Sequence, residues 1–312
     1  MSTFSIERLR TAREVLPLVE GRLPVSIDIV DRVGRTPQGS HWKAHAVHRA
    51  GSLVGFFFQY RLCRGKWEAI LLLDEPIADA TFERLVNRAQ VWSIGGPGDH
   101  VATFLERLPR LTRLTKLEMF HERTPPDYWT AMPGAVSLGV EHSERLVKFF
   151  SHHERFGIPT MAGIREFVGL ALQRGPAVVV EEDGEIVGGV LLGAATPDWI
   201  SLDGLTVRPD RRGAGLSTVL LSGGARIWSN GAVGMCGVRA TTNPGGYGLH
   251  AGQTDWFAAN LRPPKRFRGH QRLRVLALKF QERSKPWNTT YIRPEYRGED
   301  GQLRNRPDDE PG

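Results

Sequence analysis

Residues 205–217 read LTVRPDRRGAGLS, and this stretch decides the expected fold of the C-terminal half. A strand is expected to end at the proline, a short glycine-containing loop follows, and an amphipathic helix then begins. The first amides of a helix lack internal partners, and the helix dipole adds partial positive charge there. Gly213 and Gly215 remove the Cβ atoms that would hold phosphates away from those amides. The stretch therefore predicts a diphosphate site, to which Arg212 adds a charge-assisted contact and Ser217 a hydroxyl hydrogen bond.

Glycines in such a loop also fit an ordinary strand–turn–helix connection, so the loop alone does not decide between the two interpretations. Two other phosphate motifs are excluded. The sequence has no G-x-x-x-x-G-K-[ST] stretch, and its glycine spacing is not the G-x-G-x-x-G that follows the first strand of a dinucleotide-binding unit.

The same stretch resembles the signature of the GNAT family of N-acyltransferases, whose core is [R/Q]-x-x-G-x-[G/A] between the fourth strand and the third helix. Six residues match the signature in order: Arg212, Gly213, Ala214, Gly215, Leu216 and Ser217. Ser217 stands where Gly or Ala is usual. Further along, Asn243–His250 followed by Trp256 resembles the N-P-x-A-x-x-L-Y…G-F segment of the family. The resemblance covers roughly Ala135–Phe280.

This resemblance implies that acetyl-CoA, or another acyl-CoA, lies where the fourth and fifth strands separate. Backbone groups of Leu205, Thr206 and Val207 would pair with the pantetheine arm, and the Val207 amide would polarise the thioester carbonyl. The residues expected to bind the coenzyme are these three, the six residues of the signature, and Asn243. An amine, on a small molecule or a protein, would attack directly and the CoA thiolate would leave.

Three residues are candidates for proton transfer. Asp203 is the candidate base, directly or through water, and the alternative is a solvated or salt-bridged strand residue. Gly204 is expected at a bulge that opens the cleft. His250 stands where the family has its proton-donating Tyr, so either its imidazole protonates the thiolate or the acid function is lost or moved to Tyr247. Asn243 is expected to cap a helix and touch the pantetheine.

The whole chain is expected to be of the α/β class with mixed sheets. Residues 1–130 form one α/β domain, 135–281 the GNAT domain, and 282–312 a flexible tail poor in apolar residues. The order of elements in the first domain parallels that of the second, so we expect a degenerate GNAT-like repeat, as in tandem GNAT proteins. Its Asp74–Asp79 loop is acidic and has no glycine, which disfavours coenzyme binding and favours a supporting or substrate-shaping role.

Within the N-terminal half, periodicity predicts a helix over Thr11–Leu23 and an apolar strand over Lys66–Asp74. Gly95–Gly98 is expected to be a loop, and Asp99 to cap the helix that follows. The last strand of this half is expected at Lys116–Phe120.

Composition narrows the function classes. The 312 residues contain no apolar run of membrane-spanning length, and the N-terminus lacks the apolar core of a signal peptide, so a cytoplasmic location is expected. Cys63 and Cys236 suggest two buried thiols, and no metal-ligand spacing stands out.

The net charge is +7, with one dense basic block at Lys265–Arg274. This block could track nucleic acid, attract an anionic ligand, or form a solvated hairpin, and the hairpin is the favoured interpretation. The sequence thus favours an amine acyltransferase. An acyl-CoA-binding regulatory module with little turnover is the alternative, and a nucleic-acid-binding protein is the third hypothesis.

Overall fold

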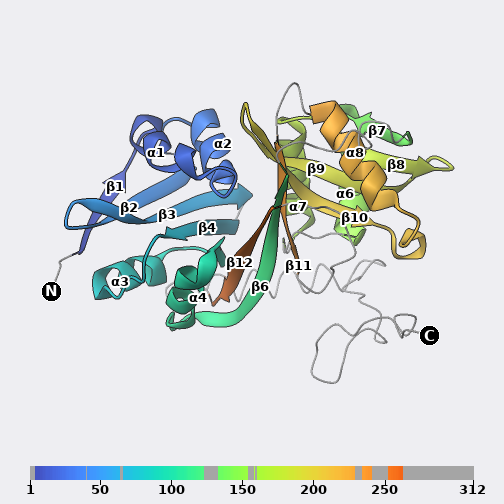
Figure 1. Cartoon of the computed structure of the whole chain (residues 1–312). Helices are drawn as coiled ribbons and strands as arrows, with labels where there is room; N and C mark the ends of the chain where they lie inside the picture. The colour runs from blue at the N-terminus through green and yellow to red at the C-terminus, as the bar shows by residue number, and fades with distance from the viewer. Residues whose placement is uncertain are drawn as a thin grey trace, which may run out of the picture. The chain divides into compact units, whose positions relative to one another are not determined.

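The computed structural model describes residues 4–39, 41–63, 66–122, 133–153, 158, 160–228, 234–240 and 252–262. In this part of the chain the strands form a single mixed sheet of 12 strands, in the order β1-β2-β3-β4-β5-β12-β6-β11-β10-β9-β8-β7 (Figure 1). The sheet confirms the expected α/β class.

The described part of the N-terminal half holds six strands, four α-helices and a 3-10 turn. In chain order they are β1 (Phe4–Leu9), α1 (Ala12–Val19), η1 (Glu20–Arg22), α2 (Ile27–Arg35), β2 (Trp42–Arg49), β3 (Ser52–Cys63), β4 (Lys66–Leu73), α3 (Ala80–Arg88), β5 (Ser93–Pro97), α4 (Gly98–Glu106) and β6 (Leu111–Glu122).

The described part of the C-terminal half begins again with a strand and a pair of helices. Its elements are β7 (Ala135–Leu138), η2 (Val140–His142), α6 (Ser143–His153), α7 (Met161–Leu172), β8 (Ala177–Glu182), β9 (Glu185–Ala195), β10 (Trp199–Val207), η3 (Pro209–Arg211), α8 (Leu216–Trp228), β11 (Gly234–Ala240) and β12 (Gly252–Leu261).

Both halves therefore follow one order: a strand, two helices, a hairpin, a further strand, a helix, and a strand parallel to the one before it. This order confirms the expected parallel between the halves. Two elements of the first half, β1 and α2, were not predicted. α2 lies against β9 and β10 of the other half.

The last strand of each half, β6 and β12, pairs with strands of the other half. β12 lies between β5 and β6, antiparallel to both, while β6 lies between β12 and β11. Each half thus has a strand of the other next to its own, and one hydrogen-bonded sheet runs through both. The boundary that we expected between residues 130 and 135 stays a prediction.

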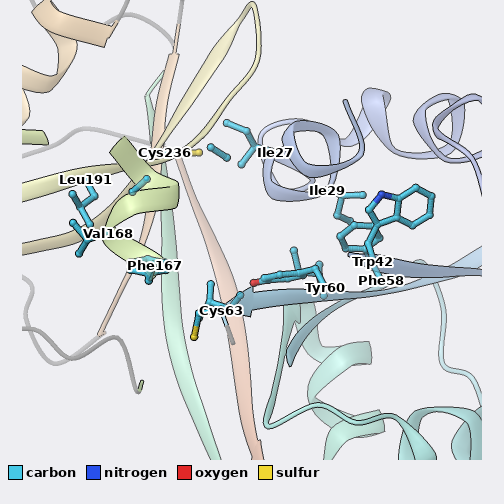
Figure 2. Packing of buried hydrophobic residues seen from close by; sticks show 14 of the residues in the cluster. Ile27, Ile29, Trp42, Phe58, Tyr60, Cys63, Phe167, Val168, Leu191 and Cys236 are labelled. Atoms are coloured by element: carbon cyan, nitrogen blue, oxygen red, sulfur yellow. The ribbon is translucent and has the colours of Figure 1, made fainter. Parts of the chain in front are cut away.

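The alternation of β3 shows how the sheet is covered on both faces, since successive side chains point to opposite faces. Phe56 and Phe58 pack with α1 and α2, whereas Phe57 packs with α3 and α4 on the other face. The first of these clusters also contains residues of α6, α7 and β9, and Figure 2 shows members from both halves, among them Ile27, Tyr60 and Leu191. Cys63 and Cys236 are buried free thiols in it, as expected.

Four boundaries differ from expectation, and one is the last strand of this half, which runs as β6 from Leu111 to Glu122 rather than from Lys116 to Phe120. The first helix ends as α1 at Val19 and continues only as a 3-10 turn. Gly95–Pro97 belongs to β5 rather than to a loop, because the missing side chains allow close packing: a Cβ on Gly96 would lie 2.0 Å from the Leu71 carbonyl oxygen. Asp99 lies in the first turn of α4, whose N-cap is Pro97.

The basic block at Lys265–Arg274 and the tail at 282–312 lie outside the described residues, so the predictions for them are not tested. None of the described helices is long and apolar enough to cross a membrane.

Candidate functional site

Strand β10 contains a β-bulge where the predicted site begins. Its pairing with β9 is irregular between Asp203 and Thr206, and Gly204 there has φ +62°, a conformation that favours glycine. Because of this bulge, Leu202 and Leu205 pack against the same apolar cluster although they are three residues apart. The bulge expected at Gly204 is confirmed.

β10 and β11 separate at this bulge. They pair in parallel only from Trp199 to Ser201, opposite Gly234 to Cys236. Beyond Ser201 β10 has no neighbour on that edge within the described chain, while β11 goes on pairing with β6 through Ala240. The two strands therefore open a gap in the backbone pairing beside residues 202–207.

Backbone direction decides which amides face this gap. The Arg208 N–H donates to the Val187 carbonyl at 2.8 Å, so it points toward β9. N–H groups of successive strand residues point to opposite edges, so the Val207 N–H points toward the open edge. An unpaired amide at this place can donate a hydrogen bond to an extended ligand or to a carbonyl oxygen.

The loop after β10 has the conformation that the motif predicts. Gly213 and Gly215 have φ +85° and +75°, and no atom lies within 4 Å of where a Cβ would be. Residues 211–215 are exposed. Among the described residues, no backbone hydrogen bond uses the amides of Gly213, Ala214 or Gly215 as donors. The start of α8 thus presents exposed amides together with the positive end of a helix dipole.

Three arginines lie in or next to this loop, and two of them form ion pairs with carboxylates. Arg208 pairs with Asp210 at 2.6 Å, and Arg211 pairs with Glu182 at 2.6 Å. The Arg212 Nε donates only a long bond of 3.3 Å to the Val207 carbonyl, and no ion pair to a described residue holds its guanidinium. Arg212 is thus the arginine of the loop that is available to an anionic ligand.

Asp203 lies just before the bulge, on the face of β10 that meets α2. A Cβ on Gly193 of β9 would lie 3.2 Å from its Oδ2, so this glycine makes room for the carboxylate. The side chain is half-buried and has no hydrogen bond or ion pair with a described residue. Burial raises its pKa to about 7, and the nearby Asp28 charge adds to the shift. A carboxylate with this pKa can accept a proton near neutral pH.

Sequence reasoning missed a polar group formed by α2, β3 and β4, whose charged members act on the pKa of Asp203. It includes Asp28 and Arg32, one helical turn apart, and Tyr60 and Glu68 from β3 and β4. The Arg32 guanidinium lies 4.0 Å from the centre of the Tyr60 ring. The Tyr60 hydroxyl donates to Glu68 at 3.0 Å. Asp28 and Arg32 are four residues apart, the spacing of neighbours on a helix, but no motif of the sequence marks them.

The corresponding loop of the N-terminal half is arranged differently. The Asp79 carboxylate accepts from the amides of Thr81 and Phe82 at 2.9 and 2.7 Å, and so takes the place at the start of α3 that a phosphate would need. Asp74 and Glu75 pair with Arg22 and Arg49.

The parallel pairing of β4 with β5 also ends after three pairs, at Ile70 and Gly95, but there the two strands stay in contact. Gly96 packs directly on the Leu71 backbone. The open edge and the exposed amides therefore occur together in the C-terminal half.

Asn243, Tyr247 and His250 lie outside the described residues, so their predicted roles are not tested. Among the residues that the structure does describe, no group of His, Cys, Asp and Glu could hold a metal ion.

The sequence and the fold were compared with known proteins. Residues 139–245 match the model of the acetyltransferase (GNAT) family. No curated protein sequence matches the chain. A Drosophila protein of known structure shares 12% identity at a TM-score of 0.55, over 82% of this chain and 98% of that chain. A GCN5-related N-acetyltransferase-like protein from Streptococcus suis shares 13% identity at a TM-score of 0.52, over 80% and 98%.

A tandem GNAT protein from the clavulanic acid biosynthesis pathway is also similar, with 14% identity and a TM-score of 0.45, over 84% of this chain and all of that chain.

Residues 139–245 thus form a domain that matches the GNAT acetyltransferase family, and the fold and the loop geometry agree with this match. The first two structural matches extend well beyond residues 139–245, so the N-terminal half resembles the GNAT fold as well.

Proposed function

We propose that the protein transfers an acyl group, most simply acetyl, from acyl-CoA to an amine by direct attack. The observation that carries the proposal is the open edge of β10 next to exposed amides at residues 213–215. A diphosphate needs several N–H donors and a cation at one place, and an extended arm needs an unpaired strand edge. Both are present within one segment of the C-terminal half.

In this proposal the diphosphate of the donor binds at the signature residues, Arg212–Ser217. The pantetheine arm pairs with the backbone of Leu205, Thr206 and Val207 along the open edge. The Val207 amide donates to the thioester carbonyl and stabilises the negative charge that develops on its oxygen during attack. Asn243 is proposed to contact the same arm.

Asp203 is proposed to take the proton of the incoming ammonium group, directly or through water. The neutral amine then attacks the carbonyl carbon, a C–N bond forms, the C–S bond breaks, and the nitrogen releases its second proton to water. The thiolate leaves with the bonding electrons and takes up a proton, for which His250, or Tyr247 in its place, is the proposed donor. The products are an amide and free CoA.

The experiment combines binding with turnover. Titration calorimetry with CoA tests the site, and the release of thiol from acetyl-CoA in the presence of amines tests the reaction. Arg212→Glu is expected to weaken CoA binding by about tenfold or more, because it replaces the available cation with an anion. Arg84→Glu is the matched control: it makes the same charge change on exposed α3, the helix that follows β4 in the other half.

No CoA uptake by the intact protein, or equal affinity in the Arg212→Glu variant, would reject the proposal. CoA uptake without thiol release for any amine would instead favour the second candidate, an acyl-CoA-binding regulatory module. His250 at the position where the family has Tyr is the observation that keeps this candidate open.

A further inference from the structure

The inference concerns the acceptor of the acyl group, and it rests on the proposed function. Its starting point is Arg32 of α2, whose guanidinium lies over the Tyr60 ring, 4.0 Å from the ring centre. Tyr60 is buried on β3, and Figure 2 shows it on the side of the sheet that carries Ile27 and Ile29 of α2. A guanidinium stacked on an aromatic face is held in place, while the N–H donors at its edge remain for other groups.

The ring beneath Arg32 is fixed by hydrogen bonds. The Tyr60 hydroxyl donates to the Glu68 carboxylate at 3.0 Å, and this carboxylate also accepts from the Ser93 hydroxyl at 3.0 Å. The Lys66 ammonium group lies 2.8 Å from it. The negative charge of Glu68 is thus already paired with a cation other than Arg32.

Arg32 itself lacks an acceptor. Its Nε is buried and has no hydrogen-bond partner among the described residues, and its guanidinium forms no ion pair with any of them, Asp28 included. The neighbouring Asp31 carboxylate is occupied, because it accepts from Arg35 at 2.8 Å and from Arg174 at 3.1 Å. Buried donors in proteins nearly always have an acceptor. The unpaired Nε therefore marks a place that an oxygen atom of a ligand would complete.

A carboxylate is the group that fits these donors. Burial opposes the charge of Arg32, but Tyr60 and the nearby carboxylates outweigh that effect and raise the pKa, so the guanidinium stays a cation. A planar guanidinium can donate from two nitrogens to the two oxygens of one carboxylate. An ammonium or an apolar group would leave the Nε unpaired.

The position of Arg32 places such a ligand on the face of the sheet that carries Asp203. The Asp31 carboxylate, one residue before Arg32, accepts from the Ala195 amide of β9 at 3.2 Å, and α2 also contacts β10. Gly193 lies two residues before Ala195, and a Cβ on it would stand 3.2 Å from the Asp203 Oδ2. Two strand residues span about 7 Å. A small molecule held at Arg32 therefore lies near the proposed base.

Charge balance favours an acceptor without net charge. The charged side chains around α2 are four carboxylates and four cations: Asp28, Asp31, Glu68, Asp203, Arg32, Arg35, Lys66 and Arg174. A carboxylate alone would add an uncompensated charge to this half-buried group, whereas a molecule that also carries an ammonium group adds none. The amine that the proposed function requires supplies this ammonium group.

We propose that Arg32 of the N-terminal half binds the carboxylate of the acyl acceptor, which is a small amino acid or a related amine that carries a carboxylate. The Arg32 Nε and a terminal nitrogen donate to the two carboxylate oxygens, and the amine of the same molecule is the nucleophile that Asp203 deprotonates. The N-terminal half thus supplies a specificity-determining residue. This is the substrate-shaping role that its acidic, glycine-free loop suggested.

The test uses the full-length protein, acetyl-CoA and three pairs of amine probes. Glycine, β-alanine and γ-aminobutyrate carry a carboxylate at increasing distance from the amine, and each is compared with its amide, which lacks that charge. Thiol release gives the ratio of kcat/KM for each acid to that for its amide. Arg32→Met is expected to lower this ratio by about tenfold or more for the best acid. Its affinity for CoA should stay unchanged, since Arg32 is not part of the coenzyme loop.

Two further variants complete the design. Arg32→Lys keeps the charge but loses the Nε and the paired geometry, so it should lower the ratio by about threefold or more. It decides the question if Arg32→Met does not fold. Arg61→Met is the matched control: Arg61 of β3 pairs with Glu166 of α7 at 2.8 Å, so this change also removes an arginine between the halves, and the ratio should stay at the wild-type value.

The inference is overturned if the Arg32 variants keep the wild-type ratio, or if Arg61→Met lowers it as much as they do. It is also overturned if the wild type releases thiol with other amines but with none of the three acids. Absence of CoA binding, or of thiol release with any amine, would instead reject the proposed function, so the two failures are distinguishable.

Discussion

The carboxylate of Asp31 and the guanidinium of Arg174 form an ion pair between the two halves, with the Arg174 Nε 3.1 Å from Oδ2. The side chain of Asp31 is 1% exposed and that of Arg174 is 11% exposed. A charge at this depth depends on its partner, because water cannot replace the lost interaction. This pair therefore holds α2 on the C-terminal half.

Asp31→Ala is expected to lower the free energy of unfolding by about 3 kcal/mol, since it leaves the Arg174 charge without its partner and the Ala195 amide without an acceptor. Urea unfolding of the full-length protein measures this. The control is Glu144→Ala, which breaks the exposed pair with Arg165 and should leave the free energy of unfolding nearly unchanged. Equal losses for the two variants would show that Asp31 has no special role.

Local patterns in the sequence predicted the C-terminal half well. The Asp-Gly pair at 183–184 is a strong turn signal for the hairpin of β8 and β9, and both residues have positive φ. The stretch at 205–217 likewise predicts a strand, a loop and a helix in succession, as β10, the loop and α8 follow one another. These elements have regular periodicity and strong turn signals, so their own residues determine them.

Interactions between distant segments could not be predicted in this way. The exchange of β12 and β6 depends on long-range pairing, which leaves no periodic signal in either strand. The missed helix α2 buries Ile27, Ile29 and Val33, but at nine residues its amphipathic pattern is too short to stand out in the sequence, and it also packs against β9 and β10 of the other half. For the same reason the motif predicted Asp203 but could not predict its neighbour Asp28.

Gly213→Ala is expected to weaken CoA binding by about tenfold, because a Cβ would stand between the ligand and the amides of the loop. The φ of +85° is unfavourable for alanine, so the free energy of unfolding should also fall by about 1 kcal/mol. Calorimetry and urea unfolding give the two values.

The control variant Gly184→Ala separates the effect of backbone strain from an effect on CoA binding. Gly184 has φ +76° and open space around it, like Gly213, but it lies in the turn between β8 and β9. It should therefore show a similar loss of stability with unchanged CoA affinity. If Gly184→Ala weakens CoA binding as much as Gly213→Ala does, the effect comes from general destabilisation and not from the loop.

Asp203 is expected to govern the pH dependence of both rate and stability. Its pKa is about 7 in the folded protein, against an ordinary value of 3.8, so the folded state binds this proton more tightly than the unfolded state does. Ionising the carboxylate therefore costs stability, and the cost grows as pH rises from about 4 to about 7 and is constant above that. Asp203→Asn removes this cost, so it should stabilise the protein at about pH 8, with a gain that fades as pH falls toward about 4.

The catalytic rate should depend on pH in the opposite direction to stability: kcat/KM of the wild type should rise with pH through about 7, and Asp203→Asn should lose this rise together with about a hundredfold or more in rate. Denaturant unfolding and thiol release, each measured across this range, test the two effects separately. A wild-type rate that is flat through pH 7 would exclude Asp203 as the base, whatever its effect on stability.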